Sequence, residues 1–278
     1  MKIIPGDKAL RQCIPNTFAN VEGEASLFEK LYPYLEQAEE WMAMNITSHE
    51  MINVIATKQD ISPLRRIAAK IITAQAMKTA IPSLDLVLTP NGFGIVNTGN
   101  VVPASKDRVE RLMVAMVNDR DIHIDAMLRR LPAEQQWLNT EQAKFFQATL
   151  FPTLSLCQRL AVRDNVYDTY LKLREKLIKI ENVLAETYFS QELYEKFRQI
   201  VSTNAACSPV VAQVIRSIQS LELLLVSDME CHTQSFYDIV NTIRERPEVF
   251  PEWHNSKTAE LYSPTVFINK KDSSGYWF

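Results

Sequence analysis

Residues 31–55, LYPYLEQAEEWMAMNITSHEMINVI, carry the pattern that decides the fold. Apolar residues recur three and four positions apart, as on the buried face of an amphipathic α-helix, and Ser26 with Glu29 offers a capping box just before the stretch. Pro33 predicts either a kink in this helix or a restart. A short second helix is expected from Ser48. The stretch therefore predicts a mainly α-helical protein.

The same pattern returns in residues 173–197, LREKLIKIENVLAETYFSQELYEKF. Identical residues occupy matching positions of the two stretches: Leu31/Leu173, Leu35/Leu177, Glu39/Glu181, Ala43/Ala185, Ser48/Ser190 and Glu50/Glu192. Each stretch is followed by a Ser-Pro pair, Ser62-Pro63 and Ser208-Pro209, which predicts an N-cap serine and an N1 proline at the start of a further helix. Unrelated helical hairpins also share leucine and alanine spacing, but the repeated Ser-Pro starts favour an internally duplicated helical unit.

Residues 84–96, LDLVLTPNGFGIV, give the clearest non-helical signal. Two short β-type runs flank a turn at Pro90, Asn91 and Gly92, so we expect a β-hairpin that projects from the helical body. A long helix is predicted from Ser105 to beyond Leu128, ending before Pro132. Another is expected from residue 140 and interrupted at residue 152.

These signals predict a helical bundle in two lobes followed by a tail. The N-terminal lobe is placed at residues 1–131 with the hairpin at 84–96, and the C-terminal lobe, repeating the first, at residues 132–246. From residue 247 onward, Pro247, Pro251 and Pro264 break up any helix. Residues 247–278 are therefore predicted to form an extended tail or a second hairpin.

The composition limits the classes of protein to which the chain can belong. The chain has 278 residues, 46% of them hydrophobic and 23% charged, enough to bury a sizeable core. The net charge is −3 and the lysines and arginines are scattered, so direct sequence-specific binding of nucleic acid is not expected. No signal peptide or membrane span is recognised, which predicts no membrane partner. Four widely spaced cysteines, Cys13, Cys157, Cys207 and Cys231, are expected to be reduced and mostly buried.

A cluster of acidic residues near residue 120 resembles a metal site at first. Its members alternate along the chain: Asp119, Asp121, His123 and Asp125. A calcium loop would need glycine and glutamate where this chain has Ile124 and Arg130. We therefore expect a solvated helix surface and no metal site.

Other chemical motifs are also incomplete. Cys231 and His232 are adjacent, which in a helix points them about 100° apart and makes no nucleophile-base pair. His49 and His254 lack partners at ligand spacing, and Gly92-Phe93-Gly94 lacks the rest of a phosphate loop. No catalytic residue, cofactor or metal is predicted, and the chain is expected not to be an enzyme. The alternative is an enzyme whose site is assembled from distant residues such as His123, His232 or Cys231.

Two segments are candidate partner-binding surfaces. They are the predicted hairpin tip, Pro90, Asn91, Gly92 and Phe93, and the aromatic C-terminus, Tyr276, Trp277 and Phe278. Aromatic residues often anchor interfaces, and a terminal strand can extend a neighbour's sheet. Trp277 and Phe278 could equally close the chain's own core.

The chain resembles an uncharacterised protein family encoded in tailed phages and prophages of Bacteroides-type bacteria, whose members resemble phage head-tail connector (adaptor) proteins. The resemblance rests on four segments that together span most of the chain: Leu31-Tyr-Pro-Tyr-Leu-Glu-Gln-Ala38, Thr89-Pro-Asn-Gly-Phe-Gly-Ile-Val96 with Pro103-Ala-Ser-Lys106, Thr149-Leu-Phe-Pro-Thr153, and Asn269-Lys-Lys-Asp-Ser-Ser-Gly-Tyr276. None of these is a chemical motif.

The resemblance implies a virion structural protein that forms a ring of twelve copies in the neck, between portal and tail, and is assembled in the cytoplasm of the bacterial host. Its expected partners are other copies of itself, the portal protein, and neck or tail-completion proteins. The chain is about twice the size of a simple adaptor, which leaves the role of the second lobe open. The alternative is a helical protein-binding scaffold or regulator, which a duplicated helical unit would also serve.

Overall fold

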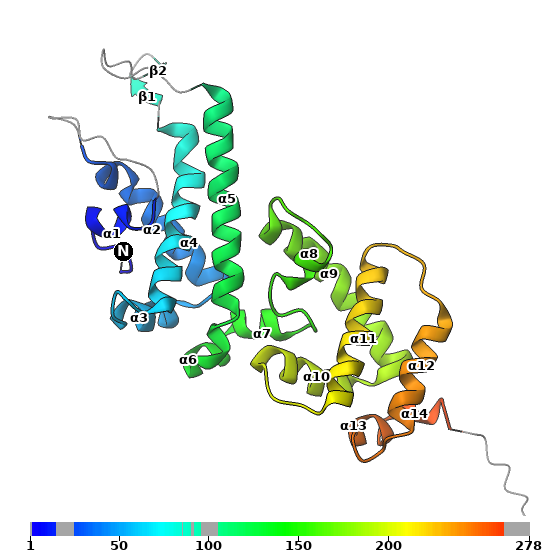
Figure 1. Ribbon diagram of the computed structural model, residues 1–278. Coiled ribbons are helices and arrows are strands. Elements are labelled where there is room, and N and C mark those ends of the chain that lie inside the picture. The colour runs from blue at the N-terminus through cyan, green and yellow to red at the C-terminus, as the bar shows by residue number, and fades with distance from the viewer. Residues whose placement is uncertain (1, 15–24, 85, 90–91, 96–104, 264–278) are drawn as a thin grey trace, which may run out of the picture. The chain divides into compact units, whose positions relative to one another are not determined.

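The computed structural model describes residues 2–14, 25–84, 86–89, 92–95 and 105–263 (Figure 1). Helices account for most of these residues, so the prediction of a mainly helical protein is confirmed. The chain divides into two compact units: unit 1 is Met1–Ile178 with Arg198–Ala206, and unit 2 is Lys179–Phe197 with Cys207–Phe278.

Unit 1 contains the first eight α-helices. Their bounds are α1 (Asp7–Arg11), α2 (Leu27–Asn45), α3 (His49–Thr57), α4 (Pro63–Ala80), α5 (Lys106–Leu128), α6 (Gln135–Leu138), α7 (Glu141–Gln147) and α8 (Ser155–Arg159). Two short 3₁₀ turns, η1 (Ile81–Ser83) and η2 (Leu131–Ala133), follow α4 and α5. Residues 132–178, which the sequence analysis assigned to a C-terminal lobe, belong to this unit.

Local sequence explains where these helices begin. Ser26 Oγ accepts a hydrogen bond from Glu29 N at 3.2 Å, and Ser26 N donates to Glu29 Oε2 at 2.7 Å, which is the predicted capping box of α2. Helix α2 continues without a restart through Pro33. Pro63 is the N1 residue of α4, and Ser105 precedes α5, both as predicted.

Two short strands, β1 (Leu86–Thr89) and β2 (Gly92–Ile95), lie between α4 and α5 in the sequence. They pair antiparallel, with Leu86 opposite Ile95 and Thr89 opposite Gly92. The predicted turn residues Pro90 and Asn91 lie outside the described residues, as do the side chains of both strands. A β-hairpin that projects from the body therefore stays a prediction.

Helix α4 lies at the centre of unit 1, in contact with α2 and with α5 (Figure 1). Its buried residues are spread around much of its circumference: Leu64, Ala68, Ile71, Ile72, Thr73, Ala74, Ala76, Met77 and Ala80. The later part of the unit is tied to the first helices, because Trp137 Nε1 on α6 donates a hydrogen bond to Ile46 O at 3.0 Å. Burial of these apolar residues is the main stabilising contribution to the unit.

A buried arginine on α5 joins four helices of unit 1. Arg120 is 1% exposed, and its Nε donates to Asp121 Oδ1 at 2.8 Å. Its Nη1 donates to Gln75 Oε1 on α4 at 2.9 Å. The guanidinium also lies 5.7 Å from the ring centre of Trp41 on α2 and 5.6 Å from that of Tyr167 on α9 (Val166–Leu184). These contacts offset the cost of removing a guanidinium from water.

The prediction of a solvated surface for the acidic residues of α5 is wrong for two of them. Asp121 and Asp125 are 2% and 8% exposed. Asp121 Oδ2 accepts a hydrogen bond from Tyr167 N at 3.0 Å, and Asp125 Oδ1 accepts one from Leu154 N at 3.0 Å. Both carboxylates satisfy backbone N–H groups at the beginnings of later helices, where a negative charge is favoured.

Unit 2 is built around α11 (Pro209–Val226) and α12 (Thr233–Arg244), which contact each other. The boundary between the units falls within α9 and within α10 (Gln191–Thr203). Between these helices lies a π-helical turn, η3 (Ala185–Phe189). Residues 251–260, assigned from sequence to an extended tail, instead form the short helices α13 (Pro251–His254) and α14 (Lys257–Glu260). A proline at N1 of α13 and the Ser256 cap of α14 favour these turns.

The π-helical turn is held by side chains from the C-terminal helices. Thr258 Oγ1 donates to Ala185 O at 3.2 Å, and Trp253 Nε1 donates to Tyr188 O at 2.8 Å. Tyr262 Oη donates to Thr187 O at 2.9 Å. A π turn interrupts the regular helical hydrogen-bond ladder, so these donors satisfy carbonyl groups at the interruption.

Helix α11 is long and apolar enough to cross a membrane, by length and composition alone. This was not expected from the sequence. Glu222 on the same helix is fully buried and accepts a hydrogen bond from Tyr194 Oη at 2.9 Å, and α11 also packs against α12. A core helix of a globular unit has the same length and composition, so the feature does not by itself assign the chain to a membrane.

We predict that Arg120→Met lowers the free energy of unfolding by about 3–5 kcal/mol, because it leaves the buried carboxylate of Asp121 without its cationic partner. The control is Lys144→Met, which breaks an exposed pair with Glu141 and should change stability by about 0.5 kcal/mol or less. Urea unfolding of the two variants measures the difference. Equal small losses would contradict the structural role of Arg120.

In unit 2, Trp253→Phe should lower the free energy of unfolding by about 1–3 kcal/mol, because the carbonyl of Tyr188 loses its donor. Tyr237→Phe is the control, since that residue is 43% exposed and its hydroxyl has no hydrogen-bond partner among the residues described. Thermal unfolding and hydrogen exchange across residues 185–189 report the effect. Unchanged exchange in Trp253→Phe would show that the π turn does not depend on this bond.

Candidate functional site

The residues predicted to bind partners fall largely beyond what the structure describes. Pro90, Asn91 and the C-terminal residues 276–278 lie outside the described residues. Gly92 and Phe93 lie in β2, but the side chain of Phe93 is not described. Their roles at an interface therefore stay predictions.

The cysteines and histidines considered for catalysis are divided between the two units. His123 belongs to unit 1, whereas Cys231 and His232 belong to unit 2. His123 Nδ1 lies 2.6 Å from Asp119 O within its own helix. His254 Nε2 lies 3.2 Å from Ile243 O near the end of α12, a contact typical of a side chain that caps the C-terminus of a helix. Among the described residues, no group of three or more His, Cys, Asp and Glu side chains could hold a metal ion.

The cysteines are all free, but they are not mostly buried as predicted: Cys157 is buried, Cys13 and Cys231 are half-buried, and Cys207 is exposed. Burial raises the pKa of the Cys157 thiol to about 12, an effect to which Asp121 adds. Burial also raises the pKa of Cys231. A raised pKa keeps a thiol protonated and unreactive near neutral pH.

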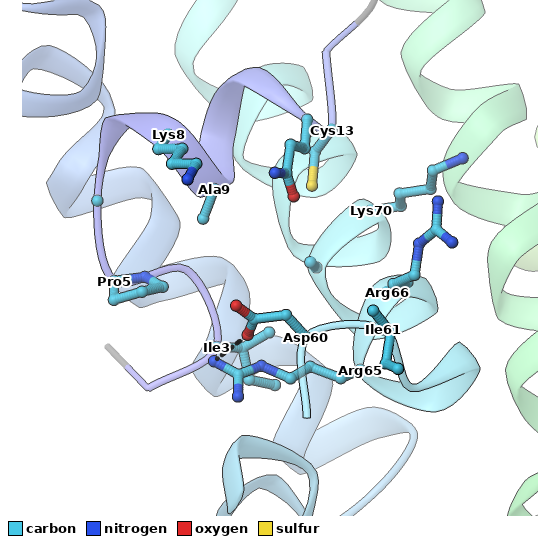
Figure 2. A pocket seen from close by; sticks show the side chains of 13 residues that line it. Ile3, Pro5, Lys8, Ala9, Cys13, Asp60, Ile61, Arg65, Arg66 and Lys70 are labelled. Atoms are coloured by element: carbon cyan, nitrogen blue, oxygen red, sulfur yellow. Dashed lines mark ion pairs between the residues drawn. The ribbon is translucent and has the colours of Figure 1, made fainter. Parts of the chain in front are cut away.

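A cavity formed by described residues lies in unit 1, between the N-terminal segment and α4 (Figure 2). We call it the N-terminal pocket. Its volume is about 690 Å³, and it is lined by Ile3, Pro5, Gly6, Lys8, Ala9, Gln12, Cys13, Asp60, Ile61, Arg65, Arg66, Ala69 and Lys70. Figure 2 shows Lys8 and Ala9 on α1 at one side of the pocket, and Arg66 and Lys70 on α4 at the other.

A buried glutamate holds the N-terminal wall of the pocket in place. Glu39 on α2 is 8% exposed, and its Oε2 accepts hydrogen bonds from Lys2 N at 2.9 Å and Ile3 N at 3.0 Å. The side chains of Ile3 and Ile4 are buried beside it. A charge-assisted pair of backbone bonds and two buried isoleucines fix this segment against α2.

Arg65 supports the opposite wall. Its Nη1 donates to Ala56 O at 2.9 Å and to Lys58 O at 2.6 Å, which satisfies carbonyl groups at the end of α3. Its Nη2 lies 3.3 Å from Asp60 Oδ1, the pair marked in Figure 2. Arg65 is therefore occupied by contacts within the protein.

Three other cations of the pocket have no such partners. Lys8, Arg66 and Lys70 form no ion pair or hydrogen bond within the part of the chain that the structure describes. Burial raises the pKa of the nearby Cys13 thiol, and the positive charges of Lys70 and Arg66 oppose that shift. Free cations around an apolar floor can bind carboxylate or phosphate groups. Sequence reasoning missed this site because its residues come from two segments, 3–13 and 60–70, that lie far apart in the sequence.

We predict that iodoacetamide at pH 8 modifies Cys207 first and leaves Cys157 unmodified until urea unfolds the protein. The physical reason is that the thiolate is the nucleophile, and a pKa of about 12 leaves very little of it on Cys157 at this pH. Mass spectrometry of tryptic peptides over time measures both rates. Faster modification of Cys231 than of Cys207 would reveal an activated thiol and would favour the enzyme alternative.

Residues 20–147, less than half of the chain, match a family of unknown function (DUF6712). The matched segment lies within unit 1 and ends with α7. No curated protein matches the chain, and no solved structure matches it. The chain is thus similar, over helices α2 to α7, to a family whose description assigns no activity.

Proposed function

We propose that the protein is a non-enzymatic structural protein of a phage virion, a head-tail connector (adaptor) that forms a ring in the neck between portal and tail. The sequence resemblance to phage and prophage proteins supports the virion assignment. Assembly takes place in the cytoplasm of the bacterial host, and the partners are further copies of the chain, the portal, and neck or tail-completion proteins.

The difference in net charge between the two units is the observation that supports assembly into a ring. Unit 1 contains 22 Lys and Arg against 20 Asp and Glu, a net charge of +2. Unit 2 contains eight Lys and Arg against 13 Asp and Glu, a net charge of −5. Opposite charges on the two units favour head-to-tail contacts between copies, and head-to-tail contacts close into rings when the rotation permits.

Matching capped turns support the proposal that the chain contains a duplicated helical unit. Ser48 and Ser190, which match in the sequence repeat, both have φ in the left-handed region, at 130° and 65°. Both cap the following helix, because Ser48 Oγ accepts from Met51 N at 3.1 Å and Ser190 Oγ accepts from Leu193 N at 3.2 Å. Unrelated helical hairpins that share only leucine spacing would not be expected to have a positive φ at matching positions. We therefore propose that residues 27–80 and 166–226 arose by duplication.

Extended arms complete the proposed ring. The hairpin tip, Pro90 to Phe93, and the aromatic C-terminus, Tyr276 to Phe278, reach a neighbouring copy or the portal. Main-chain pairing to a sheet edge together with aromatic anchors suits such contacts. A protein-binding scaffold or regulator outside a virion is the second candidate, and the N-terminal pocket with its free cations favours a binding role of that kind.

We predict that the purified chain forms assemblies of about twelve copies at low salt and dissociates as sodium chloride approaches 1 M, because the Debye length then falls to about 3 Å. Light scattering over a range of protein concentrations, with and without the portal encoded in the same genome, measures this. A protein that remains monomeric at every salt concentration and ignores the portal would contradict the proposal and favour the scaffold or regulator.

A further inference from the structure

We propose that the N-terminal pocket of unit 1 binds acidic side chains from unit 2 of a second copy of the chain. This inference rests on the proposed function, since it names the surface through which copies associate. The occupant is an acidic polypeptide segment with an apolar residue, and the contact is head to tail.

Three cations of the pocket lack ion-pair partners among the described residues. Lys8, Arg66 and Lys70 line one cavity and have no ion-pair partner within the described chain. Arg65 and Asp60, which line the same cavity, neutralise each other. The pocket therefore has an excess of positive charge that no acidic side chain among the described residues pairs with, and a carboxylate-binding surface needs such an excess.

The second argument is the position of these charges on α4. The first turn of this 18-residue helix contains Arg65 and Arg66 and no acidic residue. Positive side chains are unfavourable there, because the backbone dipoles place a partial positive charge at the beginning of a helix. Arg65 is compensated by two backbone carbonyls and Asp60, whereas Arg66 is not. A carboxylate from another chain would relieve this repulsion.

The third argument is the apolar surface beside the cations. Ile61 is 77% exposed at the rim of the pocket, and Ala9 and Ala69 contribute to its lining. An exposed isoleucine next to free cations fits a segment that presents both carboxylates and an apolar side chain. Interfaces are typically built in this way, with an apolar centre and charges around it.

Charge complementarity identifies the source of the segment. Unit 2 has a net charge of −5, and exposed glutamates such as Glu192 and Glu195 on α10 have no ion-pair partner among the described residues. Every further copy of the chain therefore carries carboxylates that could bind the pocket. Because pocket and acidic surface belong to different units, one copy can bind two neighbours, as a ring requires.

The test uses the full chain and two charge-reversed variants. Arg66→Glu with Lys70→Glu reverses two cations of the pocket. Arg163→Glu with Lys172→Glu makes the same change in net charge at exposed residues of unit 1 outside the pocket. Circular dichroism confirms that each variant is folded, and light scattering at one ionic strength measures association between copies.

We expect the pocket variant to associate at least roughly tenfold more weakly than the wild type, and the control to remain within about twofold. A hexaglutamate peptide should dissociate wild-type assemblies and should bind the pocket variant at least roughly tenfold more weakly than the wild type. If both variants assemble like the wild type, or both lose assembly equally, the pocket is not the contact, although the proposed function stands. A monomeric wild type overturns the proposed function together with this inference.

Discussion

Burial of the Arg120 guanidinium is the interaction on which the arrangement of unit 1 depends. A guanidinium removed from water is costly unless its donors are matched, and here a carboxylate, an amide oxygen and two aromatic faces surround it. These groups come from α2, α4, α5 and the beginning of α9. A helix that moved away from this position would leave the charge without a partner. The orientation of α4, and with it one wall of the N-terminal pocket, follows from this requirement.

A second buried charge fixes the other wall. Glu39 is held on α2 and binds the backbone of Lys2 and Ile3, so the N-terminal segment must lie against α2 and cannot fold into the space between α1 and α4. The pocket thus remains open because Glu39 holds the N-terminal segment against α2 and the contacts of Arg120 hold α4 in place. Glu181, which matches Glu39 in the sequence repeat, is also fully buried. A glutamate retained inside the protein at both matching positions fits a structural role, since an unpaired buried carboxylate would be strongly unfavourable.

Local signals in the sequence were sufficient to predict where α2, α4 and α5 begin. The capping box at Ser26 and Glu29 satisfies orphan backbone donors within a few residues, and Pro63 at N1 of α4 has no backbone N–H to satisfy. Such signals, like the serine that precedes α5, can be recognised without tertiary information. The burial of Asp121 and Asp125 could not be recognised in this way, because their hydrogen-bond donors, Tyr167 N and Leu154 N, are 46 and 29 residues away. The pocket was missed for the same reason. One signal was nevertheless available: Arg65-Arg66 at the start of a helix opposes the helix dipole.

Charge and duplication together explain why association between copies would be directional. Two lobes that arose by duplication would begin with similar surfaces, and similar surfaces favour symmetric dimers in which each patch meets its own copy. Net charges of +2 and −5 make the two units repel their own kind and attract each other. Such long-range attraction brings copies together but does not fix their orientation. In the proposed assembly, the N-terminal pocket, whose three cations have no partner among the described residues, would supply the short-range contact that selects one orientation. A single repeated orientation distinguishes a closed ring from a disordered aggregate.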